Sequence, residues 1–261
     1  MLLRFLGTGT STGTPMIGCD CPVCRSTDPR DARCRMCLAV ESAAGGRIVV
    51  DTPPEFRLLA VKAGLAHMDA VAITHCHMDH VAGFDDVRRF NTLAGGRPLP
   101  CYGPAGALEA LRAVFPYITD RPGPDGLFRP MIRFTPVAGA FTAGGMSIAP
   151  VPVFHPPVET CGYMFECDGR RAAHIPDCHE IPAPSMALLR EKRLDVLSLN
   201  CLRDKPHPTH LTLGRALAYA EEIGARETYF VHMSHSLPHA ATEARLPPHV
   251  HLAYDGLEVA P

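Results

Sequence analysis

Short apolar runs alternate with amphipathic stretches along most of the chain. Apolar residues at helical spacing, and short β-type runs, predict a coarse order of elements. The predicted strands are residues 2–6, 47–50, 70–73, 146–153, 163–166, 194–199, 228–231 and 250–254, and the predicted helices are residues 55–63, 81–93, 105–114, 184–190 and 211–223. Thr209 precedes the last helix and Gly224 follows it, which are typical start and stop signals. This alternation favours a layered α/β fold.

Composition narrows the class of protein further. The 261 residues, 46% of them hydrophobic, are compatible with a single domain over residues 1–261. The net charge is −2 and there are three lysines, so we expect no long nucleic acid as partner. No apolar stretch reaches the roughly 18 residues of a membrane span. The first residues do not resemble a signal peptide, and eleven cysteines then favour a reducing compartment, so we expect a cytoplasmic protein.

The most informative stretch is residues 74–80, which read Thr-His-Cys-His-Met-Asp-His. It places four metal-binding side chains within six residues, namely His75, His77, Asp79 and His80. Imidazole and carboxylate ligands suit zinc, manganese or iron. In an extended strand, His75 and His77 would point to the same side and could share one metal. Asp79 and His80 would follow on a turning backbone and reach a second metal, so the motif favours a two-metal hydrolase.

Three isolated residues, His155, Asp177 and His232, each follow a β-type run. Each alone would more often be structural. Together with the first motif, and in the same order, they resemble the metallo-β-lactamase superfamily of hydrolases. The resemblance implies a four-layered αβ/βα sandwich, with two sheets face to face and the active site at one edge. Asp51 also matches an early strand-end aspartate of that superfamily, which would support the ligands; the alternative is a simple turn residue.

The resemblance further implies how the ligands divide between two divalent ions, zinc or manganese. His75, His77 and His155 would hold one ion, Asp79, His80 and His232 the other, and Asp177 would bridge them. Once Asp79, Asp177 and a hydroxide bound to both metals are counted, about one positive charge remains, which suits a phosphodiester monoanion. Asp79 would orient that hydroxide and accept its proton.

A second metal site is predicted in the loop after the first strand. Cys19, Cys21 and Cys24 form most of a tetrahedral zinc site, and His235, three residues after His232, is the expected fourth ligand. A zinc ion with four protein ligands and no open position would have a structural role. The alternative is three ordinary reduced thiols.

This combination resembles the PhnP group of phosphoribosyl cyclic phosphodiesterases of phosphonate breakdown. The matching features are Leu6-Gly-Thr-Gly, Gly18-Cys-x-Cys-x2-Cys24, residues 74–80, Tyr102-Gly-Pro, Gly162-Tyr, Asp177, His210 and His232-x2-His235. The resemblance implies hydrolysis of phosphoribosyl 1,2-cyclic phosphate or a related cyclic nucleotide, and a possible homodimer. It also implies that His210 is catalytic and binds phosphate or protonates the leaving oxygen. The alternative is that His210 merely lies near a helix start.

Some features depart from the group or leave other functions open. His179 stands where the group has small residues, and Cys34 and Cys37 are expected to be structural thiols. One alternative function is a tRNA 3′-processing endonuclease of the same superfamily, although the chain shows no basic arm. Another is a non-catalytic binding protein like the pyrroloquinoline quinone biosynthesis factors, although here the first metal motif is complete.

Overall fold

The computed structural model describes residues 1–120 and 129–261. Its strands are β1 (Leu2–Gly7), β2 (Cys37–Glu41), β3 (Arg47–Val50), β4 (Ala70–Ala72), β5 (Leu99–Gly103), β6 (Ile132–Pro136), β7 (Phe141–Ala143), β8 (Met146–His155), β9 (Val158–Cys167), β10 (Arg170–Ile175), β11 (Val196–Asn200), β12 (Glu227–Val231), β13 (Val250–Leu252) and β14 (Leu257–Val259). Its helices are α1 (Phe56–Lys62), α2 (Met78–Val81), α3 (Arg88–Leu93), α4 (Ala105–Val114), α5 (Ala183–Glu191), α6 (Leu213–Ile223) and α7 (His239–Glu243), with 3-10 turns η1 (Pro29–Asp31) and η2 (Phe84–Val87).

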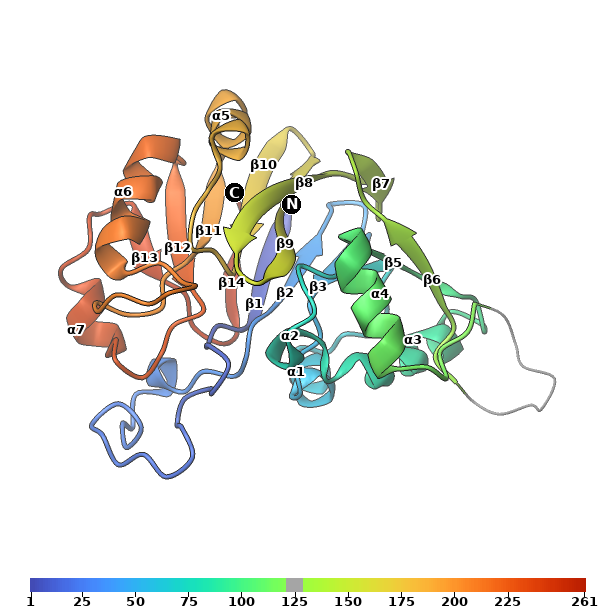
Figure 1. Cartoon of the computed structure of the whole chain (residues 1–261), viewed down its shortest axis with the longest axis horizontal. Helices are drawn as coiled ribbons and strands as arrows, with labels where there is room; N and C mark the ends of the chain where they lie inside the picture. The colour runs from blue at the N-terminus through green and yellow to red at the C-terminus, as the bar shows by residue number, and fades with distance from the viewer. Residues whose placement is uncertain (121–128) are drawn as a thin grey trace.

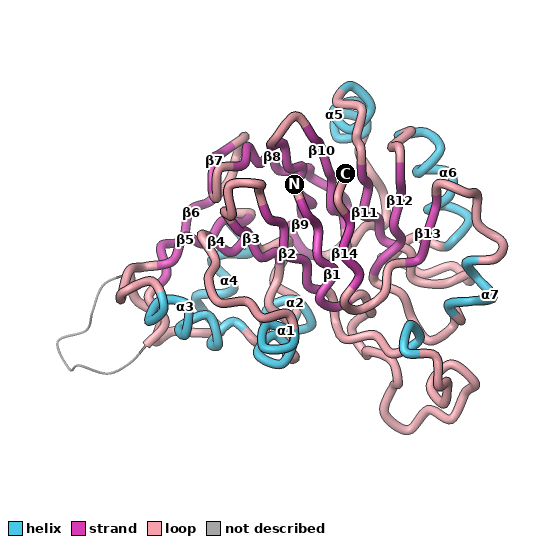
Figure 2. Tube along the Cα trace, turned by 180° about the vertical axis from the view of Figure 1, so that it is seen from behind, coloured by secondary structure: helices cyan, strands magenta, loops and turns pink. Residues whose placement is uncertain are grey.

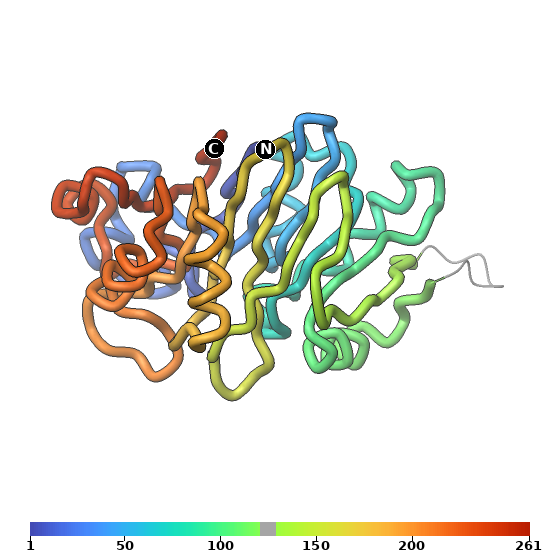
Figure 3. The backbone as a smooth tube through the Cα atoms, turned by 90° about the horizontal axis from the view of Figure 1, so that it is seen from above, coloured from blue at the N-terminus to red at the C-terminus, as the bar shows by residue number. Residues whose placement is uncertain are grey.

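The strands form two mixed sheets that pack face to face, with helices on both outer sides (Figure 1). The first sheet has the order β14-β1-β2-β3-β4-β5-β6 and the second β13-β12-β11-β10-β9-β8-β7. Strands β3 to β6 are parallel in the first sheet, and β10 to β13 are parallel in the second. The predicted four-layered αβ/βα sandwich is confirmed. The view from behind shows the helices outside the strands (Figure 2), and the two chain ends lie side by side because β14 pairs with β1 (Figure 3).

The side-chain alternation of the strands builds three apolar layers. In β2, Leu38 and Val40 lie in the layer between the sheets, whereas Cys37 and Ala39 lie in the layer beneath α1, α3 and α4. Successive side chains of a strand point to opposite faces, so a central strand of a sandwich is apolar on both sides. The third layer packs α5 and α6 on the second sheet. The strand-end loops therefore extend from two sheets that are packed on both faces.

Two element predictions were wrong in detail. Residues 81–93 are not one helix but the end of α2 followed by η2 and α3. The N-terminal cap of α6 is Thr212, whose side chain accepts a hydrogen bond from the Arg215 N–H, and not Thr209. Gly224 ends α6 in the left-handed conformation, as the sequence predicts.

Within residues 1–120 and 129–261, no helix combines the length and the apolar character that crossing a bilayer requires.

Candidate active site

The predicted metal ligands lie on loops that follow strands of both sheets. His75 and His77 lie in the loop after β4, beyond the end of the strand rather than within it, and Asp79 and His80 lie on α2. The other three residues, His155, Asp177 and His232, stand at or just after the ends of β8, β10 and β12. Figure 1 shows α2 next to the turn between β8 and β9, which brings the two sets together.

The first group consists of His75, His77 and His155, with Asp177 beside them. The His77 Nδ1 atom lies 2.9 Å from His75 Nε2 and 3.3 Å from His155 Nε2. The Asp177 Oδ2 atom lies 3.7 Å from His75 Nε2 and 3.5 Å from His155 Nε2. Three ring nitrogens and one carboxylate oxygen thus converge on one point.

The second group consists of Asp79, His80 and His232. The Asp79 Oδ2 atom lies 3.5 Å from His80 Nε2 and 3.6 Å from His232 Nε2. The other oxygen of Asp177, Oδ1, lies 3.3 Å from His80 Nε2 and 3.2 Å from His232 Nε2. The two oxygens of a single carboxylate therefore face two different groups of donors.

Within residues 1–120 and 129–261, several of these inward-facing atoms have no hydrogen-bond partner. They are His80 Nε2, His232 Nε2 and Asp177 Oδ1, and all three are buried. A buried polar atom without a partner costs about 1–3 kcal/mol, so such a group needs an explanation. Converging imidazole nitrogens and carboxylate oxygens suit divalent transition metals. The residues present therefore fit the predicted metal ions, and their role as ligands remains a prediction.

Neighbouring residues fix the tautomer of three histidines. The Nδ1 atom of His80 lies 2.7 Å from Asp51 Oδ2, so it donates its proton to that carboxylate. The Thr74 hydroxyl also donates to Asp51, at 2.7 Å, and can then only accept from the Nδ1–H of His75, at 3.0 Å. His155 Nδ1 donates to the Thr209 carbonyl, at 2.8 Å. In each ring Nε2 faces the centre, and it is the nitrogen that is unprotonated, and able to bind a metal, in the neutral ring.

The electrostatics of the centre keep Asp177 ionised. Burial raises the pKa of Asp177, but the imidazoles of His232 and His80 outweigh this and hold the pKa well below its usual range. Burial and the charge of His80 lower the pKa of His75 well below its usual range, so this ring stays neutral. Burial lowers the pKa of His80, but Asp177 and Asp51 outweigh this and raise it well above its usual range. A bound metal would displace that proton, because histidine ligates in its neutral form.

His210 lies beside the two groups. Its ring stacks on His232 at 4.7 Å, and its Nδ1 lies 3.9 Å from Asp177 Oδ2. Asn200, at the end of β11, accepts from the Leu211 N–H and turns its amide nitrogen toward His210 Nδ1, at 3.3 Å. Nδ1 of His210 is therefore an acceptor and Nε2 carries the proton. Burial and the charge of His232 lower the pKa of His210 to about 2, so the ring is a neutral donor.

The predicted cysteine site also comes together. His235 Nδ1 lies 3.2 Å from Cys19 Sγ, 3.3 Å from Cys21 Sγ and 3.5 Å from Cys24 Sγ. The Cys24 N–H donates to Cys21 Sγ, which lowers the pKa of Cys21 to about 6 despite partial burial. Three sulfurs and one imidazole nitrogen within 4.8 Å of one another match the donor set of a structural zinc site.

The remaining predicted residues lie outside these groups. Cys37 is buried and its thiol donates to the Asp51 carbonyl. Burial raises the pKa of Cys34 to about 12, which fits an unreactive thiol. His179 lies at the rim, with its ring 6.3 Å from that of Phe154, a side chain that is half exposed.

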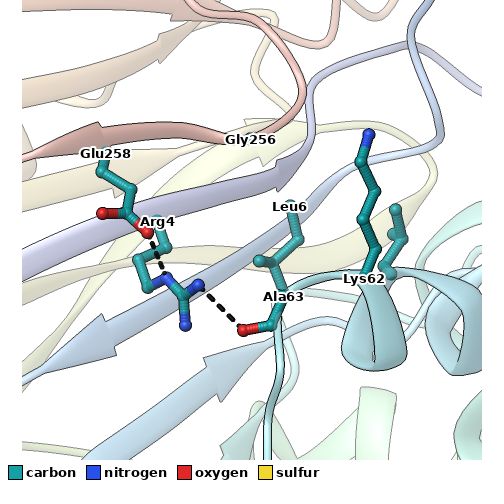
Figure 4. Close-up of a pocket in the computed structure, with 7 residues that line it drawn as sticks. Arg4, Leu6, Lys62, Ala63, Gly256 and Glu258 are labelled. Atoms are coloured by element: carbon teal, nitrogen blue, oxygen red, sulfur yellow. Dashed lines mark hydrogen bonds and ion pairs between the residues drawn. The ribbon is translucent and has the colours of Figure 1, made fainter.

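One cavity of about 270 Å³ lies on β1, β14 and α1 and includes no residue of either donor group. Figure 4 shows its Arg4 side chain between Glu258 and the Ala63 carbonyl, to which it donates at 2.8 and 2.9 Å. This guanidinium is already engaged, so the cavity adds nothing to the site.

Comparison with known proteins fits this geometry. A family model described as the beta-lactamase superfamily domain matches residues 46–233, which include both histidine groups. The chain belongs to the β-lactamase superfamily. This superfamily member shares 40% identity, with a TM-score of 0.89, with the crystal structure of a diphosphatase from the PhnP family, over 99% of this chain and 97% of that one. The predicted resemblance to PhnP is confirmed.

Two further relatives bear on the function of this superfamily member. It is 37% identical to a Porphyromonas gingivalis protein named octanoyltransferase, over 97% of this chain and 50% of that protein. The zinc-bound PqqB of Methylobacterium extorquens has the same fold, with a TM-score of 0.78 and 22% identity over the whole of both chains. The chain spans about half the length of the curated relatives it matches first.

Proposed function

We propose that this protein is a metal-dependent hydrolase of a small cyclic phosphodiester, such as phosphoribosyl 1,2-cyclic phosphate or a 2′,3′-cyclic nucleotide. One observation carries the proposal: the two oxygens of Asp177 face two separate donor groups, His75–His77–His155 and Asp79–His80–His232. Similarity over nearly the full length to a PhnP-family diphosphatase supports hydrolysis at a phosphorus centre.

Two divalent ions held by these groups would offset the charge of the phosphoryl oxygens and lower the pKa of bound water. Asp79 is the least buried member of the second group, with a side chain that is 13% exposed. Burial raises the pKa of Asp79, but the nearby imidazoles of His232 and His80 outweigh this and lower it. Asp79 is thus a carboxylate that can orient the attacking water and accept its proton.

His210 is suited to act on the phosphoryl oxygen or on the departing oxygen. Hydrolysis forms a bond from the water oxygen to phosphorus, breaks one ring P–O bond and leaves a proton on the departing oxygen. The His210 Nε2–H, fixed by Asn200, can donate to a phosphoryl oxygen or to that departing oxygen. Because the ring is buried, it stays neutral. A neutral donor would not repel the nearby metal ions.

The test compares hydrolysis of ribose 1,2-cyclic phosphate, a 2′,3′-cyclic nucleotide, a diphosphate ester and a precursor tRNA, with Mn²⁺ or Zn²⁺ added. We expect the protein to hydrolyse a cyclic phosphate and the His77→Ala variant to lose this activity. The substitution removes the ring nitrogen that lies against both His75 and His155. Cleavage of only the tRNA would favour the endonuclease alternative. No metal-dependent turnover would favour a binding protein.

The name of the Porphyromonas gingivalis relative does not place octanoyl transfer in the region that this chain matches, because half of that protein lies outside the match. An octanoyl thioester, included as a fifth substrate, addresses this directly. Consumption of the thioester with no cleavage of a phosphate ester would overturn the phosphodiesterase proposal.

A further inference from the structure

A buried arginine lies beneath the segment that carries both His232 and His235. Arg33 is 1% exposed, and its backbone pairs with Thr14 through N–H···O bonds of 2.8 and 2.9 Å. This pairing closes the base of the loop that contains the three cysteines. Figure 1 shows this blue N-terminal loop next to α7, which follows the His232–His235 segment in the chain.

The Arg33 guanidinium binds the turn around His235 at two points. Its two terminal nitrogens donate to the Ser234 carbonyl at 2.8 Å and to the Leu237 carbonyl at 2.6 Å. These carbonyls stand on either side of His235 and Ser236 in the chain. A planar guanidinium can donate two hydrogen bonds in fixed directions, whereas an ammonium is a single point donor.

Asp31 completes the arrangement. Its carboxylate lies 3.6 Å from the Arg33 guanidinium and accepts a hydrogen bond of 2.8 Å from the His239 N–H, at the start of α7. The buried charge of Arg33 is thus paired, and the turn is held at Ser234, Leu237 and His239. Removing one partner of a buried ion pair is strongly destabilising. Arg33 and Asp31 are therefore expected to stay together and to hold the turn in one position.

We infer that Arg33 is a positioning residue, which holds the His232–His235 segment so that one segment supplies a ligand to each of the two proposed metal centres. The inference rests on the metal assignments of the proposed function. His232 Nε2 faces Asp79 and Asp177, while His235 Nδ1 faces the three sulfurs. His232 also adopts a φ of 60°, which few non-glycine residues do, so its position needs outside support.

The test measures zinc loss from the folded protein. Zinc-loaded wild type and Arg33→Lys are challenged with a chromogenic chelator well below their unfolding temperatures. The cysteine site is followed separately through the thiolate-to-metal absorption of the cobalt-substituted protein. We expect Arg33→Lys to lose zinc from the cysteine site about tenfold faster, in the range seen when a residue that orients a metal ligand is removed, and the cobalt absorption to weaken.

The control is Leu111→Ala, in the buried face of α4, which lowers stability without touching the segment. Faster zinc loss in Arg33→Lys but not in Leu111→Ala supports a positioning role. Equal rates in the two variants overturn it. Should Arg33→Lys not fold, Asp31→Glu keeps the charge that faces Arg33 but moves the acceptor of the His239 N–H, and a smaller change in the same direction is expected.

A wild type without zinc at the cysteines would overturn both the site and this inference. That result is distinguishable from failure of the phosphodiesterase proposal, because the hydrolysis assay depends on the other two metals.

Discussion

Three buried histidines of the candidate site each donate a hydrogen bond from Nδ1–H to a neighbouring residue. The acceptors are Asp51 for His80, the Thr74 hydroxyl for His75 and the Thr209 carbonyl for His155. Each bond fixes the ring plane and leaves Nε2 as the ring nitrogen that points inward, where a metal would bind. The residues behind the ligands are therefore part of the site, although they do not face its centre.

Asp51→Asn tests this arrangement. Asp51 has a φ of 61°, which asparagine also tolerates, so the backbone should be unchanged. The amide offers one acceptor oxygen where the carboxylate now serves Thr74 and His80. We expect metal affinity to fall about 10–100-fold, measured by competition with a chelator. Thr52→Val is the control, because the buried Thr52 hydroxyl has no hydrogen-bond partner among the described residues, and a similar loss there would refute the account.

His210→Ala separates catalysis from metal binding. Because His210 is placed outside both ligand groups, we expect kcat to fall about 10²–10⁴-fold with the metal content unchanged. His77→Ala, in contrast, should lose metal as well as activity. Elemental analysis of both purified variants, alongside the hydrolysis assay, checks the difference. Loss of metal in His210→Ala would make it a ligand and not a proton donor.

The candidate ligands were predictable because each follows an apolar strand, and strand ends meet at one edge. Asn200 follows the predicted strand 194–199 in the same way, and the same rule applied to amides would have found it. Arg33 and the Thr209 carbonyl give no such signal. Arg33 looks like any other arginine in the sequence, and a backbone acceptor carries no residue signature.

At the scale of elements, the short helix α2 is tied to the loop that follows β3. The Thr52 N–H donates to the His80 carbonyl at 2.7 Å, and the Gly83 N–H donates to the Thr52 carbonyl at 3.0 Å. This contact explains why residues 81–93 are not one helix. The apolar spacing of the sequence predicted a continuous helix, but the chain turns at Gly83, where its backbone packs against Pro53.

Gly83→Ala tests the close approach. A Cβ at this position would overlap the Pro53 carbonyl oxygen and press on Phe56. Overpacking of this kind costs about 1–3 kcal/mol, so the free energy of unfolding should fall by that amount in a urea titration. Gly214→Ala, in α6 with open space around it, is the matched control and should be neutral or stabilising. Equal effects of the two substitutions would contradict the packing argument.

At the scale of the whole molecule, the site joins the two sheets. His75, His77, Asp79 and His80 follow a strand of the first sheet, whereas His155, Asp177 and His232 end strands of the second. The general fold was predictable from the alternation of elements and the motif order. Strands β2, β5 and β6 and the three-residue strands β7 and β14 were not predicted. The run of β5 contains Pro100 and Gly103, which are typical of turns, and three residues carry too little periodicity to be told from a loop.

Because the donors come from both sheets, metal binding should stabilise the fold. A ligand at about 100 times its dissociation constant adds about 2.7 kcal/mol per site, and a domain of this size gains about 2–4 °C per kcal/mol. We therefore expect a chelator to lower the thermal midpoint by several degrees, measured by scanning calorimetry, and added Zn²⁺ to restore it. The shift should be smaller in His77→Ala. A chelator-independent midpoint would argue against metals between the sheets.

The most direct measurement is anomalous diffraction from crystals grown with Mn²⁺, recorded at the manganese edge. We expect two peaks on opposite sides of the Asp177 carboxylate, one bound by Oδ2 together with His75, His77 and His155, the other by Oδ1 together with Asp79, His80 and His232. A single peak, or two peaks with both Asp177 oxygens on one ion, would contradict this expectation.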